Sequence, residues 1–202
     1  NSSVAIDVSM LPALTEGTAC ADHRRMAATD DLPLQRFTII EVNDAKVPLC
    51  LRLATSLAAK IAADLGANVL KIEPPGGDPV RREPPLLPQG ESALFQFLNT
   101  SKRSLVLDLE SGAGRATLAD LLDKADAVLF EEPAPVAALL RASRATPVEI
   151  AAFPAGMDAA ARPVSEFTIL ALGGLLHMVG EPERKPLRLG GHQASYAAGL
   201  TA

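Results

Sequence analysis

IAADLGANVLKIEPPGGDPVR, residues 61–81, joins the end of a helix to a strand and then to a turn. Apolar residues at positions 53, 57, 61 and 65 predict a helix from Leu49 to Leu65, and Gly66 follows where helices commonly end. Val69 to Glu73 is a short apolar run typical of a buried strand. The prolines and glycines from Pro74 to Gly90 then predict a long loop. A helix, a strand and a loop in this order are one unit of an α/β fold.

The same alternation continues along the chain. The pattern predicts further strands at 36–42, 105–109, 127–131, 148–153 and 187–190, and further helices at 92–98, 112–124, 134–143, 167–178 and from 193 onward. The Gly173-Gly174 pair is expected to break the helix at 167–178. Repeated strand–helix units predict a Rossmann-like three-layer α/β domain, in which a mainly parallel sheet carries helices on both faces.

Composition and charge separate the chain into two parts and exclude several functions. Residues 1–33 are small, polar and turn-rich and form a tail-like segment, whereas residues 34–202 are expected to form the domain. The 202 residues include 48% hydrophobic and 21% charged residues, which is ordinary globular composition. A net charge of −5 gives no electrostatic footprint for nucleic acid, and an anionic ligand would need local cations.

The cysteines and the apolar runs indicate a cytoplasmic protein without a metal. Cys20 and Cys50 have neither metal-ligand nor redox-motif spacing, so a reduced compartment is expected. The polar start does not resemble a signal peptide. No apolar run approaches the roughly 18 residues that a membrane span needs, so no membrane partner is expected.

Several residues that could carry chemistry also have an ordinary structural interpretation. Gly112-Ala113-Gly114 precedes a helix but lacks the third glycine of a dinucleotide fingerprint, so it indicates a helix start. Lys102 and Arg103 are either a solvated basic pair or phosphate ligands. Glu166 begins a predicted helix, where the helix dipole favours a carboxylate, and Ser195 could be a cap or a packing residue.

Four segments follow one another along the chain: GANVLKIE with the following GGD and Arg81, SKRSLVLDLES, KADAVLFEE and EFTILALGG. In this order they resemble the class III CoA-transferases (the CaiB/BaiF family), which include α-methylacyl-CoA racemases. The resemblance runs from Leu34 to Ala202 and corresponds to the first half of a typical member. It implies acyl-CoA and a carboxylic acid as substrates, coenzyme A as substrate or carrier, and no tightly bound cofactor.

The resemblance also implies a set of site residues. The stretch that contacts CoA in the family corresponds here to Lys102, Arg103, Leu107, Asp108, Leu109 and Glu110. Glu166 occupies the place where transferases and racemases keep a functional carboxylate. Ser195, four residues before Gly199, occupies the place of the transferases' nucleophilic aspartate. Glu166 and Ser195 are therefore the candidate catalytic residues.

The sequence departs from the family pattern at several places, among them the glycine-rich turn expected after the fifth strand, which is reduced to Phe153-Pro154-Ala155-Gly156. Glu131-Glu132-Pro133-Ala134-Pro135 replaces Asn-Phe-x-Pro-Gly, and two carboxylates there would repel a polyphosphate. A serine at position 195 needs a neighbouring base, and none lies beside it in sequence. Racemisation needs both an acid and a base, for which Glu166 is the one candidate.

The N-terminal segment suggests how the parent protein is organised. SSVAIDVSMLPAL resembles a family segment that normally follows the nucleophile, which predicts two family units in tandem. A second family unit or a homodimer is therefore the expected protein partner.

Two functions remain open at this stage. One is acyl-CoA transfer between carboxylic acids, or acyl-CoA racemisation, by the parent protein. The alternative is a catalytically degenerate half that packs against an active unit. An unrelated nucleotide-binding domain would require a complete phosphate loop, which the sequence lacks.

Overall fold

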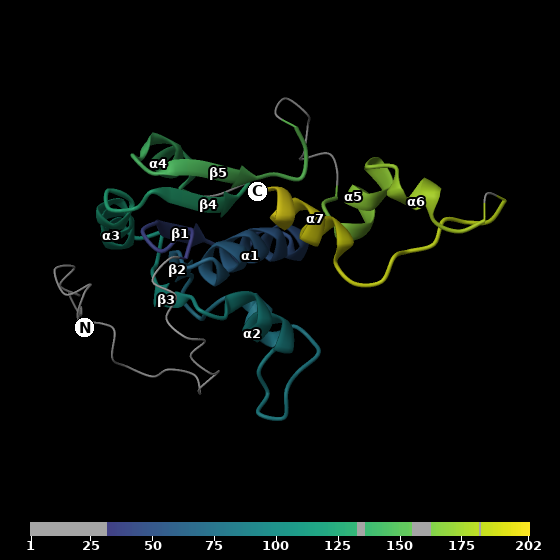
Figure 1. The fold of residues 1–202 in the computed structure, drawn as a ribbon, viewed down its shortest axis with the longest axis horizontal. Coiled ribbons are helices and arrows are strands. Elements are labelled where there is room, and N and C mark those ends of the chain that lie inside the picture. The colour runs from purple at the N-terminus through teal and green to yellow at the C-terminus, as the bar shows by residue number, and fades with distance from the viewer. Residues whose placement is uncertain (1–31, 133–135, 155–162, 182) are drawn as a thin grey trace. The chain divides into compact units, whose positions relative to one another are not determined.

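The computed structural model describes residues 32–132, 136–154, 163–181 and 183–202. Five parallel strands form one sheet: β1 (Thr38–Val42), β2 (Asn68–Glu73), β3 (Arg103–Val106), β4 (Ala127–Glu131) and β5 (Thr146–Ile150). Their order in the sheet is β3-β2-β1-β4-β5, and the arrows can be followed in Figure 1. The predicted parallel α/β domain is confirmed. Most of the predicted tail at 1–33 lies outside the described residues.

Helices connect the strands and cover the sheet. They are α1 (Leu49–Asp64), the short 3-10 helix η2 (Pro79–Arg82), α2 (Ala93–Asn99), α3 (Gly112–Leu122), α4 (Ala137–Ala142), α5 (Glu166–Leu172), α6 (Leu175–Met178) and α7 (Gln193–Thr201). Right-handed crossovers place α1 on one face of the sheet and α3, which leads from β3 back to β4, on the other. Within the described ranges, no helix combines the length and hydropathy that a membrane crossing requires.

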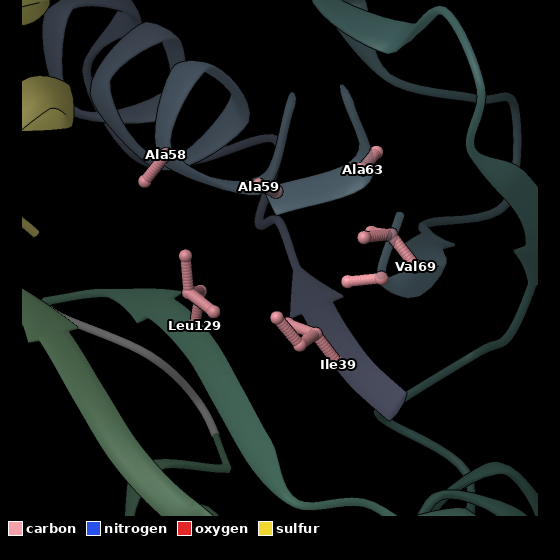
Figure 2. Close-up of a cluster of buried hydrophobic side chains, with 7 residues drawn as sticks. Ile39, Ala58, Ala59, Ala63, Val69 and Leu129 are labelled. Carbon is pink, nitrogen blue, oxygen red and sulfur yellow. The ribbon is translucent and has the colours of Figure 1, made fainter. Parts of the chain in front are cut away.

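Small residues let α1 lie close to the sheet. Ala58, Ala59 and Ala63 of α1 pack against Ile39, Val69 and Leu129 of three neighbouring strands, as Figure 2 shows. Aliphatic side chains of the sheet fill the space that the alanines leave.

Helix α7 packs tightly on α1 at a glycine. A Cβ atom on Gly199 would lie 2.7 Å from the carbonyl oxygen of Ala54 and 2.9 Å from Cβ of Leu57. The glycine therefore allows the two helices to approach more closely than any other residue would. This contact holds the last helix of the chain against the central one.

The predicted elements agree with the structure in type more than in extent. Helix α1 ends before Gly66, whose φ of 101° requires glycine, and Gly174 with φ of 79° separates α5 from α6 as predicted. The predicted strand at 105–109 is wrong in its limits, because β3 ends at Val106. Its neighbour β2 ends at Glu73, since Pro74 has no N–H to continue the ladder. No strand forms at 187–190, although all four of these residues are described.

Candidate functional site

Helix α1 contacts the sheet through apolar residues in its carboxyl half and through polar and charged residues in its amino half. Its amino half carries Arg52 and Ser56 over the carboxyl ends of the strands, where Glu41 of β1 and Lys71 of β2 lie. Glu41 is two residues after Ile39, so both side chains point toward α1. Charged side chains thus occupy the half of the interface nearest to the ends of the strands.

Five residues with buried side chains form what we call the charge cluster: Glu41, Arg52, Lys71, Asp78 and Lys102. Nζ of Lys71 lies 2.7 Å from Oε1 of Glu41 and 3.0 Å from Oδ2 of Asp78. Nζ of Lys102 lies 2.7 Å from Oε2 of Glu41, and Nη1 of Arg52 lies 3.0 Å from Oδ1 of Asp78. Every cation of the cluster therefore has a carboxylate partner, as buried charges require.

The cluster shifts the pKa values of its members in opposite directions. Burial alone would raise the pKa of Glu41, but the ammonium groups of Lys102 and Lys71 outweigh it and lower this pKa to about 2. Burial lowers the pKa of Lys102 to about 8 despite the attraction of Glu41. For Lys71, Glu41 and Asp78 outweigh burial, and its pKa is raised. Glu41 is thus the anion on which both lysines depend.

Contacts of the same kind fix the loop after β2. Arg81 donates two hydrogen bonds to the carboxylate of Glu73, from Nε at 2.8 Å and from Nη2 at 2.7 Å, in the bidentate arrangement. Its guanidinium stacks 4.0 Å from the ring centre of Phe95. The backbone N–H of Asp78 also donates to Glu73, at 2.9 Å. Asp78 and Arg81, which follow the glycine pair of this loop, are therefore both tied to the buried carboxylate of Glu73.

A cavity of about 340 Å³ opens at the carboxyl ends of β1 to β4. Its lining combines aliphatic and polar side chains: Val42, Asn43, Asp44, Ala45, Lys46, Pro74, Pro75, Leu107, Asp108, Leu109, Glu110, Glu131 and Val136. The chain leaves β1 toward β2 on one side, while β4 lies on its other side. This reversal of strand order is the place where open parallel sheets bind their ligands.

Four of the six predicted CoA contacts line this cavity. They are Leu107, Asp108, Leu109 and Glu110, which follow β3 where the strand has left the sheet. The start of α3 fixes this wall, because a Cβ atom on Gly114 would lie 2.0 Å from the carbonyl oxygen of Asp108.

Lys102 and Arg103 lie elsewhere. Lys102 belongs to the charge cluster and also donates to the carbonyl of Ser56 at 2.8 Å. Arg103 begins β3, at the opposite end of the strand, and donates to Asn68 at 2.5 Å. Neither lines the cavity, so their predicted contact with CoA gains no support from its geometry.

The two predicted catalytic residues, far apart in sequence, are in direct contact. Oγ of Ser195 donates a hydrogen bond of 2.7 Å to Oε2 of Glu166. The backbone N–H groups of Ala194 and Ser195 also donate to this carboxylate. Glu166, at the start of α5, therefore caps the first turn of α7. Its carboxylate also lies within hydrogen-bond distance of the Ser195 hydroxyl, a contact that the sequence did not reveal. The two side chains are buried and do not line the cavity, with 8% of Glu166 and 2% of Ser195 exposed.

The two glutamates that replace the family's Asn-Phe pair have different environments. Glu132 is partly exposed and pairs with Arg141 at 2.8 Å. Glu131 is fully buried and lines the cavity. Burial raises the pKa of Glu131 to about 8, against the effects of Lys71 and of a hydrogen bond from Asn43. With its pKa raised in this way, Glu131 is mainly neutral at pH 7, and the charge that the two glutamates were expected to bring is reduced to that of Glu132.

The prediction from sequence missed part of the cavity. Asn43, Asp44 and Lys46 follow β1 and were not predicted as site residues, and Glu131, which ends β4, was expected only to repel phosphates. Their place directly after two neighbouring strands was the available signal, since the carboxyl ends of parallel strands meet at one edge. That signal required knowing that β4 lies beside β1.

Comparison with known proteins gives the family. The family model described as CoA-transferase family III matches residues 47–202. The chain is 34% identical over 149 residues to the succinyl-CoA:(R)-benzylsuccinate CoA-transferase subunit BbsE of Thauera aromatica, covering 67% of this chain and 36% of that protein. It is 34% identical over 150 residues to the acetyl-CoA:oxalate CoA-transferase of Acetobacter aceti, covering 69% of this chain and 38% of that protein.

Solved structures agree with these matches. The Rv3272 protein of Mycobacterium tuberculosis superposes with a TM-score of 0.70 at 25% identity, over 85% of this chain and 48% of that one. A CaiB/BaiF family protein from Brucella suis gives a TM-score of 0.67 at 25% identity, over 84% and 48%. The chain thus spans less than half of the length of these relatives. With the family model matched over most of its length, the chain belongs to CoA-transferase family III.

Proposed function

We propose that residues 34–202 bind coenzyme A in the cavity at the carboxyl ends of β1 to β4, as part of a protein that transfers CoA between carboxylic acids. The observation that carries this proposal is the place of Leu107 to Glu110. The family resemblance assigns this segment to CoA, and the same segment forms one wall of the cavity.

The cavity has the composition that an amphipathic carrier needs. Aliphatic side chains from three segments (Pro75, Leu109 and Val136) offer contact to apolar parts of a ligand. Asn43 and the backbone around Asp108 offer polar groups. The substrates would be an acyl-CoA and a carboxylic acid, as the names of the relatives from Thauera and Acetobacter indicate for those proteins.

Glu166 and Ser195 are the proposed catalytic pair. A hydroxyl 2.7 Å from a carboxylate has a base within reach, which is the geometry that activates a serine nucleophile. Attack of Oγ of Ser195 on the thioester carbonyl would form an ester, break the carbon–sulfur bond and pass the hydroxyl proton to Glu166. Glu166 would then return this proton to the departing thiolate, so that CoA leaves as the thiol.

A second candidate function rests on the same pair. Glu166 accepts three hydrogen bonds from the start of α7, and neither residue borders the cavity. These contacts favour a structural role for both side chains. The chain would then be a non-catalytic half that packs against another family unit, or against a second copy in a homodimer.

Titration with acetyl-CoA in a calorimeter tests the binding proposal. Micromolar affinity is expected for the natural sequence. Ala45→Trp should weaken binding at least tenfold, because Ala45 is an exposed residue of the cavity wall and the indole would fill the space. Ala116→Trp is the matched control, since Ala116 is exposed on α3 and outside the cavity. Absence of binding at millimolar acetyl-CoA would reject the proposal in favour of the structural half.

A further inference from the structure

Glu131 is a buried carboxyl group with a defined orientation at the cavity. Its Oε1 accepts a hydrogen bond from Nδ2 of Asn43, and its Oε2 lies 3.4 Å from the backbone nitrogen of Asp44. The amide of Asn43 cannot be reversed, because its Oδ1 accepts from Lys71, an ammonium group with no acceptor atom. Oε1 is therefore fixed as an acceptor. Oε2, with its long contact alone, is the oxygen that can carry a proton.

None of the lysines and arginines in the described ranges forms an ion pair with Glu131. Lys71 is paired with Glu41 and Asp78, and Lys102 is paired with Glu41. Lys46, the one cation among the described residues that line the cavity, lies 2.8 Å from Glu110. The charged groups near Glu131 are Glu41 of β1, Lys71 of β2, Asp44 and Lys46 after β1, and Asp108 and Glu110 after β3. An ionised Glu131 would thus add a further negative charge to an acidic wall.

The pKa of Glu131 shifts in the direction expected for a buried carboxyl group that has no ion-pair partner among the described residues. Burial raises the pKa of Glu131 to about 8, with Glu41 acting in the same direction and Lys71 and Asn43 against it. With this pKa about 90% of the molecules hold a neutral carboxyl at pH 7 and about 10% at pH 9. The buried group is then a hydrogen-bond donor at neutral pH and an anion in alkaline solution.

We propose that Glu131 determines the affinity of the cavity for coenzyme A through its proton, so that the cavity binds the anionic carrier only while this carboxyl is neutral. The inference rests on the proposed function. The neutral group donates from Oε2 to an acceptor oxygen of the ligand, whereas the ionised group repels the phosphates of CoA. The proposed role is particular to this chain, because Glu131 occupies the position where the family usually has asparagine.

Acetyl-CoA is the probe, because its thiol is acylated and its phosphates, with a second pKa of about 6, keep their charge above pH 7. Calorimetric affinity of the natural sequence should fall about tenfold from pH 7 to pH 9, in proportion to the neutral fraction of Glu131. Glu131→Gln keeps a neutral donor and should change less than twofold over this range. Glu132→Gln, the matched neighbour, should follow the natural sequence.

A second measurement needs no variant. Titration at pH 8 in two buffers of different ionisation enthalpy should show uptake of about half a proton per acetyl-CoA bound. An equal fall in affinity for the natural sequence and for Glu131→Gln would overturn the inference and assign the pH dependence to another group, such as Lys102. Affinity independent of pH, or binding without proton uptake, would overturn it as well. Absence of acetyl-CoA binding at every pH tested would reject the proposed function itself, and with it the role of Glu131.

Discussion

Glu41→Gln removes the carboxylate that two buried lysines share. Lys71 keeps Asp78, but Lys102 keeps only neutral acceptors among the described residues, the carbonyl of Ser56 and Oδ1 of Asn99. Leaving a buried charge without its partner costs roughly 3–5 kcal/mol. The glutamine has the shape of the glutamate, so the loss reports charge rather than packing.

The loss of stability caused by Glu41→Gln should depend on pH. The pKa of Glu41 is about 2 in the folded protein against 4.5 as the ordinary value. A lowered folded-state pKa stabilises the protein above pH 4.5, and this contribution is lost as the pH falls toward 2. It amounts to about 3 kcal/mol at pH 7 and about 1 kcal/mol at pH 3. The difference in unfolding free energy between the natural sequence and Glu41→Gln should therefore be about 2 kcal/mol smaller at pH 3 than at pH 7.

Urea denaturation followed by circular dichroism at pH 7 and pH 3 measures this difference. Glu132→Gln is the control, because that carboxylate is partly exposed and its pair with Arg141 should contribute less than about 1 kcal/mol. An equal free-energy difference at both pH values would refute the assignment of Glu41 as the anion that balances the cluster.

Three further variants test the contacts of α7. Ser195→Asp should lower the melting temperature at pH 7 but much less at pH 4, because two carboxylates would meet where Glu166 now accepts a hydrogen bond from the Ser195 hydroxyl. Equal losses at both pH values would exclude charge repulsion. Glu166→Ala should cost about 1–3 kcal/mol in urea denaturation by leaving the part-buried N–H of Ala194 and the buried N–H of Ser195 unpaired. A loss below about 0.5 kcal/mol would show that the cap contributes little. Gly199→Ala should cost about 1–3 kcal/mol through the 2.7 Å approach to Ala54, whereas Gly112→Ala, with open space around it, should not destabilise the protein.

The local part of the fold was predictable from sequence. The alanine-rich helix, its end at Gly66 and the strand at 127–131 follow from periodicity and from glycine placement within a few neighbouring residues. The strand at 105–109 could not be delimited in this way, because its end depends on Pro74, which directly follows the neighbouring strand β2. Alternation along one segment carries no information about where its partner stops.

The candidate site was predictable in part for the same reason. Leu107 to Glu110 could be assigned from a contiguous motif, and the structure places this segment on the cavity. Lys102 has the sequence context of a phosphate ligand, but a carboxylate 61 residues earlier pairs with it in the core. The contact between Glu166 and Ser195 likewise joins two helices, so neither residue reveals it alone.

The anchored loop after β2 has a consequence for any molecule that enters the cavity. Pro74 and Pro75 form part of the wall, and the clamp of Arg81 on Glu73 holds the backbone immediately beside them. Ring closure has already removed most rotational freedom from these two residues. A ligand would thus bind to a surface that is already ordered. The entropy cost of ordering this side of the cavity would therefore reduce its affinity only a little.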